Sequence, residues 1–394
     1  MKISCLHENL AKGLNIVGRA VASRSTLPVL GNVLLSTDSA GLKLSATNLE
    51  MGITCWIGAK VHEEGSTTLP AKTLIDLVGT LPKERIDLDL DVRTQTMKVA
   101  CAEFTNEIKC IDSNDFPVLP STDDKYDLEI NVSNLREMID QVVFVAATDD
   151  SRPVLTGVEV TIEKEKLTFA AADGFRLAVC SSSLSTADDT HIDVIIPARA
   201  LAELARIIGD ESDVVSITMP PSGGQIIFRV KDVELVCQLI EGTFPDYQQL
   251  LPDSYQTRVV MSTEKILAAC RAAQIFARES SYAVTLSVKS GENPGEDRVD
   301  VSANSAETGS NESSIEASVD GDSIEMAFNV RYLTEVLRVI GTPDVALETN
   351  GEASPGVLRP VGRDDFVSVV MPMHVGRESY SLNKMLRSID PILQ

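Results

Sequence analysis

The 394-residue chain carries one pattern three times along its length. Each copy has an amphipathic helical segment, an apolar stretch with a strand that ends in small polar residues, a second helical segment and a hairpin. In the first two copies one matching segment reads STLPVLGNVLL and DSRPVLTGVEV, and the more diverged third copy reads SSYAVTLSV. Pro28 and Asn48 match Pro153 and Asp173 at an offset of 125 residues. Solenoid repeats have roughly 20–50 residues, so this longer period predicts three tandem copies of one small domain.

The periodicity of apolar residues predicts an α+β fold. Strands are indicated by alternation, as in IDLDLDV at 86–92, and by turn residues such as PPSGG between neighbouring runs. Two helices per copy on one face of an antiparallel sheet would satisfy both patterns. Similar Pro- and Asp-rich segments end the first two copies, at 116–127 and 244–256. The expected helices cover 8–24, 71–78, 133–145, 198–208, 263–278 and 330–339, and the expected domains cover 1–121, 122–253 and 254–374, followed by an extension at 375–394.

The distribution of charge is uneven. The chain has a formal net charge of −23, yet its six expected helices contain twelve basic and seven acidic residues. The helices therefore sum to +5 and the rest of the chain to −28, which predicts two surfaces of opposite sign. Ordinary solvated helix faces are the alternative explanation.

Residue patterns typical of catalysis, metal binding or cofactor binding are absent. The four histidines have no partner at ligand spacing, and the seven cysteines form no CxxC pair, so buried reduced thiols are expected. The stretch GLNIVGRA at 13–20 lacks the lysine of a phosphate-binding loop. No apolar run approaches the length of a membrane span, so a cytoplasmic protein without a membrane partner is expected. The most unusual cluster is ADGFR at 172–176, which alone would be a turn at a strand end.

Five strings, in order and at matching spacing, resemble a known family. RPVLTGV, ADGFRLAVC, EGTFPDY, FNVRYL and VVMPM are similar to segments of the bacterial DNA polymerase III beta subunits, the DNA sliding clamps. The resemblance covers residues 1–373. It implies a non-catalytic processivity factor, a head-to-tail homodimer that closes into a ring with helices inside and sheets outside. The implied partners are double-stranded DNA without sequence preference, the DNA polymerase III alpha subunit, the clamp loader and other proteins with a clamp-binding motif.

Elementary geometry agrees with a dimeric ring. Packed helices are about 10 Å across, so a ring of six leaves a hole of roughly 9 Å, too narrow for a duplex about 20 Å wide. Twelve helices from two copies leave roughly 28 Å by the same estimate. A head-to-tail contact that closes on rotation gives such a ring rather than a filament.

DNA contacts are implied at positions on the inner helices. Arg24 occupies a DNA-contact position of the family, and Arg199 stands where a contact lysine is expected. The family's His-Gln and Tyr-Tyr positions are here Thr148, Asp149, Pro153 and Val154, which puts contacts from this loop in doubt. The other helix cations expected to face DNA are Lys12, Arg19, Lys72, Arg206, Arg271 and Arg338.

The resemblance also implies a peptide-binding groove between the second and third domains. Apolar walls with a few polar anchors suit short extended motifs, and methionine adapts to varied partners. Ala172 replaces a threonine of the family, Phe175 a histidine and Gln249 an arginine, so this groove should be more apolar and less basic. The implied lining is Leu155, Ala172, Gly174, Phe175, Arg176, Leu177, Pro245, Leu250, Tyr282, Asn329, Tyr332, Ser354, Val369, Met371, Pro372 and Met373.

Two further regions carry expectations. The family places apolar dimer contacts at positions that match Ile108, Ile275 and Phe276. Beyond MPM, the segment 374–394 has Leu382, Met385, Leu386 and Ile389 on one helical face. A mobile tail is the expectation for this extension, with coverage of the groove or packing in the dimer as alternatives.

Two other classes of protein remain open from the residues. One is an enzyme with an interdomain active site at Asp173 and Arg176, although a nucleophile, a metal set and a phosphate loop are missing. The other is a scaffold that does not encircle DNA.

Overall fold

The chain divides into two compact units. The computed structural model describes residues 1–22, 25–38, 41–121, 126–184, 192–209, 214–220, 223–291, 293 and 295–373. Unit 1 comprises Met1–Leu135 and Ala200–Leu239, and unit 2 comprises Arg136–Arg199 and Ile240–Gln394. Both units therefore take part of the expected central domain, and the expected domain bounds stay a prediction.

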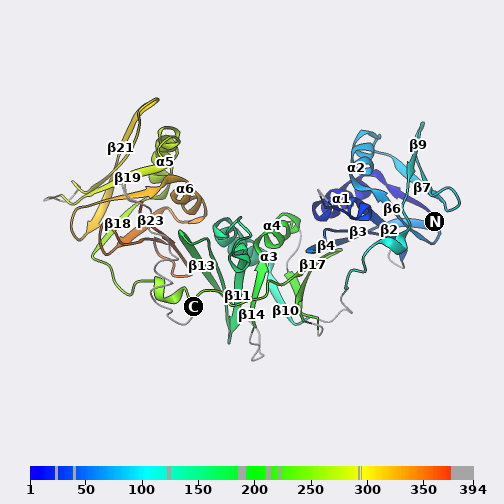
Figure 1. The fold of residues 1–394 in the computed structure, drawn as a ribbon, viewed down its shortest axis with the longest axis horizontal. Coiled ribbons are helices and arrows are strands. Elements are labelled where there is room, and N and C mark those ends of the chain that lie inside the picture. Colours follow the sequence, from blue (N-terminus) through cyan, green and yellow to red (C-terminus); the bar gives the residue numbers. More distant parts are fainter. Residues whose placement is uncertain are drawn as a thin grey trace. The chain divides into compact units, whose positions relative to one another are not determined.

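Unit 1 contains two antiparallel sheets (Figure 1). The first sheet has the order β5-β1-β7-β8-β9, and the second has the order β10-β15-β16-β17-β4-β3-β2-β6. The second sheet is continuous across copies of the repeat, because β17 pairs with β4. The elements are β1 Lys2–Leu6, α1 His7–Val17, β2 Asn32–Asp38, β3 Gly41–Thr47, β4 Met51–Ile57, β5 Ala59–Glu63, β6 Ser66–Pro70, α2 Ala71–Thr80, β7 Arg85–Asp91, β8 Thr96–Cys101, β9 Phe104–Lys109, β10 Leu128–Asn131, β15 Val214–Thr218, β16 Gln225–Val230 and β17 Val233–Gln238.

Unit 2 is built on one sheet of the order β14-β11-β12-β13-β25-β24-β23-β18-β21-β20-β19-β22. Here β13 pairs with β25, which again joins two copies of the repeat. Its strands are β11 Gly157–Glu163, β12 Lys166–Ala172, β13 Arg176–Ser183, β14 Ile192–Pro197, β18 Thr257–Ser262, β19 Ala283–Lys289, β20 Arg298–Ser305, β21 Gly309–Asp320, β22 Ile324–Asn329, β23 Asp344–Thr349, β24 Gly356–Pro360 and β25 Phe366–Val370. Its helices are α5 Thr263–Ala277 and α6 Val330–Val339, while α3 Val132–Val142 and α4 Ala198–Ile207 cross the division between the units.

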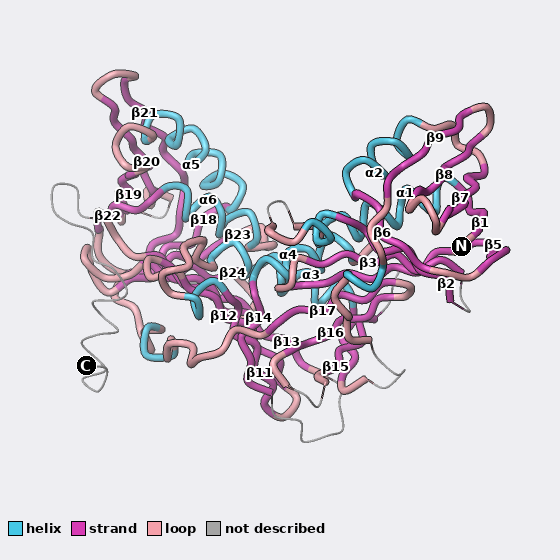
Figure 2. The backbone as a smooth tube through the Cα atoms, turned by 45° about the vertical axis from the view of Figure 1, so that its right-hand side comes forward, coloured by secondary structure: helices cyan, strands magenta, loops and turns pink. Residues whose placement is uncertain are grey.

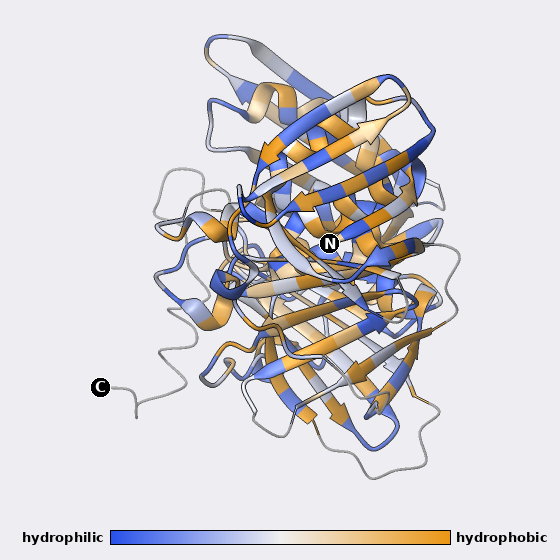
Figure 3. Cartoon of the chain, turned by 90° about the vertical axis from the view of Figure 1, so that its right-hand side faces the viewer, coloured by the Kyte–Doolittle hydropathy of each residue, from blue (hydrophilic) through white to orange (hydrophobic). Residues whose placement is uncertain are grey.

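Pairs of neighbouring helices pack on the sheets, as the periodicity predicted. In unit 2, α5 contacts α6 and packs on β20 and β21; in unit 1, α1 contacts α2 and packs on β4 (Figure 2). The inward face of α5 consists of Ile266, Ala269, Cys270, Ala273 and Ala277, at helical spacing. Along the strands, hydrophobic and hydrophilic residues alternate (Figure 3). The predicted α+β layering is therefore confirmed.

Two α-helices end three or more residues earlier than predicted. The expected helix 8–24 is α-helical only to Val17, continues as a 3-10 turn Gly18–Ala20 and is extended at Val21. The expected helix 133–145 ends as an α-helix at Val142 and continues as the 3-10 turn Val143–Val145. A run of β-branched valines, whose side chains crowd the preceding turn, disfavours a longer α-helix there.

A strand that the sequence analysis missed precedes the first helix of every copy. These strands are β1, β10 and β18, so the leading helices do not open the repeat. Alternating buried positions, such as Ile3 and Cys5 in β1, were the available signal.

All seven cysteines are free thiols, and all but Cys110 are buried, as expected. Burial raises the pKa of the Cys270 thiol to about 12, so this group is an unreactive neutral thiol. Among the described residues, no helix combines the length and apolar character needed to cross a membrane. The same residues contain no group of three or more His, Cys, Asp or Glu side chains arranged to hold a metal ion.

Candidate functional site

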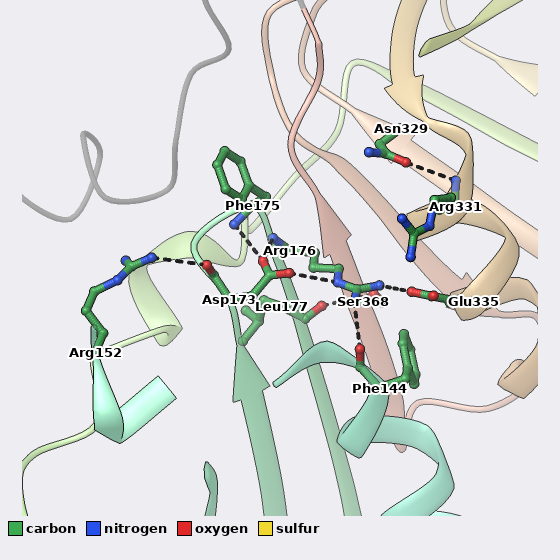
Figure 4. A network of polar contacts seen from close by, with 10 residues as sticks. All are labelled: Phe144, Arg152, Asp173, Phe175, Arg176, Leu177, Asn329, Arg331, Glu335 and Ser368. Atoms are coloured by element: carbon green, nitrogen blue, oxygen red, sulfur yellow. Dashed lines mark hydrogen bonds and ion pairs between the residues drawn. The ribbon is translucent and has the colours of Figure 1, made fainter. Parts of the chain in front are cut away.

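Arg176 is the centre of a buried polar network in unit 2 (Figure 4). Its Nε donates to Asp173 Oδ2 at 3.0 Å, and its Nη2 donates to the carbonyl oxygen of Phe144 at 2.6 Å. Its Nη1 donates to Glu335 of α6. The guanidinium also lies over the Tyr332 ring, 4.3 Å from the centroid. Each guanidinium nitrogen thus has a partner, and the network ties β13 to α6.

The turn before β13 positions the exposed ring of Phe175. Asp173 Oδ1 accepts hydrogen bonds from the backbone N–H of Phe175 at 2.8 Å and of Arg176 at 3.1 Å. Gly174 has φ +95°, a conformation in which glycine is favoured. Arg152 Nη2 donates to the Asp173 carbonyl oxygen at 3.4 Å. The polar residues of ADGFR are therefore structural, and the turn presents Phe175 to solvent with 36% of its surface exposed.

The structure brings many of the predicted groove residues together. Leu155, Ala172, Leu177 and Val369 belong to one buried apolar cluster, and Leu250 packs against it. The cluster also contains Phe244, which precedes the partly exposed Pro245. We call this set the unit 2 apolar cluster; its remaining buried members are Ala170, Ile195, Val357 and Val367.

The end of the last strand runs beside the Asp173 turn. The backbone N–H of Met371 donates to the Phe175 carbonyl oxygen at 2.9 Å, and that of Met373 donates to Ala327 at 2.7 Å. Met371 and Pro372 are buried, whereas Met373 is partly exposed. Two predicted lining residues, Met371 and Phe175, are thus direct neighbours.

Other predicted groove residues have structural contacts of their own. Asn329 caps α6, its Oδ1 accepting from the backbone N–H of Arg331 at 3.0 Å. The Arg331 guanidinium lies over the Tyr282 ring at 5.2 Å. Ser354 donates its backbone N–H to the Gly351 carbonyl oxygen at 3.0 Å. Among the described residues, Ser354 is not a member of the unit 2 apolar cluster.

Sequence reasoning missed two members of the Arg176 network, Phe144 and Glu335. Glu335 lies three residues after Tyr332 in α6, so the same helix face presents both to Arg176. Burial, followed by the nearby Asp173 carboxylate, raises the pKa of Tyr332. The three-residue spacing of Tyr332 and Glu335 was the one signal in the sequence that could have linked Glu335 to this site.

The described DNA-contact cations of the prediction are exposed, Arg19 in the 3-10 turn after α1 and the others on α-helices. Arg199 lies in the first turn of α4, and Arg24 falls outside the described residues. Arg19 and Arg206 share one carboxylate, because Arg19 Nη1 lies 3.2 Å from Glu203 Oε2 and Arg206 Nη1 lies 2.5 Å from Glu203 Oε1. The other exposed helix cations of the prediction are Lys12, Lys72, Arg271 and Arg338.

The loop with the unusual residues 148–154 is held by its own contacts. Asp149 accepts from the backbone N–H of Ser151 at 3.0 Å and from its hydroxyl at 2.7 Å. These hydrogen bonds lower the pKa of the Asp149 carboxyl, which is therefore ionised. Thr148, Asp149 and Pro153 are exposed, and Val154 packs against the unit 2 apolar cluster.

The three expected dimer residues differ in exposure. Ile108 is buried in β9, an edge strand of its sheet. Ile275 of α5 is 60% exposed, on the side opposite to the buried face of that helix, and Phe276 is partly buried. Phe104 of β9 is a further exposed apolar residue that the sequence analysis missed. The extension with Leu382, Met385, Leu386 and Ile389 lies outside the described residues.

Comparisons with known proteins agree along the whole described chain. Residues 1–120, 129–246 and 248–374 match the N-terminal, central and C-terminal domains of the DNA polymerase III beta subunit. The beta sliding clamp of Synechococcus elongatus is 33% identical over 379 residues, covering 95% of this chain and 100% of that protein. The beta sliding clamp of Pseudomonas putida is 31% identical over 379 residues, with the same coverage.

Solved structures show the same fold. The crystal structure of the DNA polymerase sliding clamp from Bacillus subtilis has a TM-score of 0.89 and 25% identity, covering 95% of this chain and 99% of that one. The DNA polymerase III subunit beta from Pseudomonas aeruginosa has a TM-score of 0.86 and 29% identity, covering 95% and 100%. These matches confirm the predicted family and the predicted non-catalytic role, and they do not favour an enzyme or a DNA-free scaffold. The chain therefore belongs to the bacterial DNA polymerase III beta subunits, the beta sliding clamps.

Proposed function

We propose that two copies of this chain close head to tail around duplex DNA in the bacterial cytoplasm and tether the replicative polymerase to it. The observation that carries the proposal is the exposure of helix-borne cations, such as Arg199 and Arg271, in a chain with a net charge of −23. Such cations can meet phosphates without reading sequence. Retention would then come from ring closure, and the acidic remainder of each copy would disfavour DNA elsewhere.

Glu203 keeps the proposed DNA contacts weak. Its carboxylate lies beside Arg19 and Arg206 and offsets part of their charge. A sliding ring needs contacts that break easily at each step, so this acid on a basic helix suits the function. The two arginine side chains are 39% and 59% exposed, whereas the Glu203 side chain is 13% exposed. Surface ion pairs contribute about 0.2–1 kcal/mol, which sets the scale for the charge that Glu203 offsets.

Replacing Glu203 by glutamine should strengthen DNA binding, and replacing Arg199 by alanine should weaken it. Freeing two arginines should tighten binding by roughly 1.5- to 5-fold, the equivalent of about 0.2–1 kcal/mol. Arg199→Ala should lose one phosphate contact, so its log affinity should fall less steeply with log salt concentration, with a slope less negative by about 0.9. The measurement is the affinity for a short duplex over a range of KCl concentrations.

Arg298→Ala is the matched control, because Arg298 is an exposed arginine on the strand β20 rather than on a helix. It should leave both the affinity and the salt slope at the wild-type values. Equal effects of Arg199→Ala and Arg298→Ala would show that the helices have no special role.

We further propose that the surface around Phe175 and Met373 binds clamp-binding motifs of the polymerase alpha subunit, the clamp loader and other partners. The unit 2 apolar cluster contains Ala172 and Leu177, which flank the turn that carries Phe175. The Arg176 network fixes that turn. An exposed aromatic ring on a rigid turn is a typical anchor for an extended peptide, since little of its freedom is lost on binding.

Phe175→Ala should weaken binding of a labelled peptide from the alpha subunit by roughly tenfold, about 1.4 kcal/mol. Because Phe175 is exposed, the fold should be unaffected. Fluorescence anisotropy measures the affinity, and Phe104→Ala, at an exposed phenylalanine of unit 1, is the control. Unchanged affinity of the Phe175 variant would place the peptide elsewhere.

A further inference from the structure

A cavity of about 120 Å³ opens in unit 1, where the start of β4 and the end of β17 meet the segment 117–120. No residue of this cavity belongs to the proposed DNA, peptide or dimer sites. We call it the unit 1 pocket. It is lined by Thr47, Leu49, Glu50, Met51, Gly52, Pro117, Val118, Leu119, Pro120, Gln225, Val236, Cys237 and Gln238.

The unit 1 pocket repeats the backbone geometry of the Asp173 turn. Asn48 Oδ1 accepts from the backbone N–H of Glu50 at 3.0 Å and of Met51 at 2.9 Å, as Asp173 Oδ1 does for the residues two and three positions on. The backbone N–H of Gln238 donates to the Glu50 carbonyl oxygen at 2.9 Å.

The counterparts in unit 2 follow residue by residue. The hydrogen bond from Gln238 to Glu50 corresponds to the one from Met371 to Phe175, which is also 2.9 Å long. The pairing of β17 with β4 likewise corresponds to that of β25 with β13. The unit 1 pocket therefore lies at the β4–β17 pairing of unit 1, the place that corresponds to Phe175 and Met371 at the β13–β25 pairing of unit 2.

The side chains at the matching positions differ. Met51 stands in the place of Arg176 and Gly52 in the place of Leu177. A Cβ at Gly52 would lie 2.7 Å from Leu119 Cδ2, so glycine lets Leu119 pack close to the sheet. The buried guanidinium network of unit 2 thus has an apolar wall as its counterpart in unit 1.

Leu49 occupies the place of Gly174 at a conformational cost. Its φ is +77°, a region that a leucine rarely adopts. Its side chain is nevertheless 52% exposed at the pocket rim. A glycine would adopt this backbone conformation freely. Because the leucine side chain is largely exposed, it adds little to the packing of the core, so core packing does not explain the backbone strain at Leu49.

The size and charge of the pocket define its ligand. Typical small-molecule sites have about 300–1,000 Å³, so a cavity of about 120 Å³ suits one aliphatic side chain better than a cofactor. Val118, 96% exposed, and Leu49 flank it with apolar surface. Glu50 is exposed, and none of the lining residues is basic, so a cationic neighbour is favoured.

We propose that the unit 1 pocket is a second peptide-binding site of the clamp. Its occupant is a short extended segment of a partner protein that places one leucine-like side chain in the cavity and a lysine or arginine against Glu50. This inference rests on the internal repeat and the pocket itself, and does not require the proposed site around Phe175 to be correct.

A pair of charge-swapped peptides tests the proposal on the full-length clamp. The probes are blocked, fluorescein-labelled pentapeptides, Lys-Leu-Ser-Leu-Lys and Glu-Leu-Ser-Leu-Glu, measured by fluorescence anisotropy. The wild-type protein should bind the lysine peptide at least fivefold more tightly. Glu50→Lys should reverse this preference, whereas Glu64→Lys, at an exposed acid of unit 1 outside the pocket, should leave it unchanged.

A second variant separates binding from folding. Leu49→Gly removes the side chain at the pocket rim, so it should weaken binding of the lysine peptide at least fivefold. It also relieves the backbone strain at this position, so the melting temperature should not fall. Gln95→Gly, at another residue with positive φ, is its control and should bind as the wild type does. Phe175→Ala should also bind as the wild type does. Wild-type binding by both pocket variants, or no preference in the wild type, would overturn the proposal.

Discussion

Arg176→Ala should lower the stability of unit 2 by about 3 kcal/mol, because breaking a buried ion pair by removal of one partner costs about 3–5 kcal/mol. The change leaves the carboxylates of Asp173 and Glu335 and the carbonyl oxygen of Phe144 without their shared donor. It also removes the planar group that lies over Tyr332. For a unit of this size the melting temperature should fall by roughly 6–12 °C.

Calorimetry of the full-length chain measures this effect, because a protein of several domains need not unfold in one step. Arg176→Lys should restore only part of the loss, since one ammonium group lacks the fork geometry that reaches three acceptors. Arg331→Ala, at an exposed arginine of α6, is the control and should shift the melting temperature by no more than about 2 °C. Equal shifts for Arg176→Ala and Arg331→Ala would contradict the structural role of the network.

The elements of this fold were predictable because most of their periodicities are unambiguous. The α6 segment 330–339 and the alternating strand at 86–92 were recognised to within a residue or two. The strand preceding each first helix was missed, because a run of four to six residues, such as β10, carries a weak signal beside a long helix. The pairing of strands from different copies of the repeat could not be predicted either. The strands β13 and β25 pair although they lie far apart in the sequence, and no local pattern indicates this contact.

The candidate site was reached through a resemblance rather than from its chemistry. The motif ADGFR by itself indicates a turn, and the structure shows such a turn, with the carboxylate of Asp173 holding the backbone of Phe175. Partners that lie far away in sequence, such as Phe144 and Glu335, could not be assigned. The unit 1 pocket was equally hidden, although the offset of 125 residues already aligned Asn48 with Asp173. The offset cannot show that a cavity lies there, lined by Gly52 and Leu119 among others.

Ile275→Asp should convert the proposed dimer into monomers at concentrations where the wild type is dimeric. Ile275 is 60% exposed on the face of α5 that points away from the core, so the described part of the chain leaves most of this apolar side chain uncovered. Burying a carboxylate in an apolar contact should cost at least about 2 kcal/mol, roughly a 30-fold weaker dimer. Sedimentation equilibrium over a range of concentrations measures the shift.

Val214→Asp is the matched control, an exposed valine of unit 1 at the start of β15. The two variants should also separate on DNA after loading onto a nicked circle. The control should stay trapped until the circle is linearised, whereas Ile275→Asp should leave at once, because a broken ring has only weak helix cations to hold it. If Ile275→Asp remained dimeric and trapped, the interface would lie elsewhere, while the helix cations and the surface around Phe175 would keep their proposed roles. Loss of trapping with the dimer intact would instead place Ile275 at a contact made during loading.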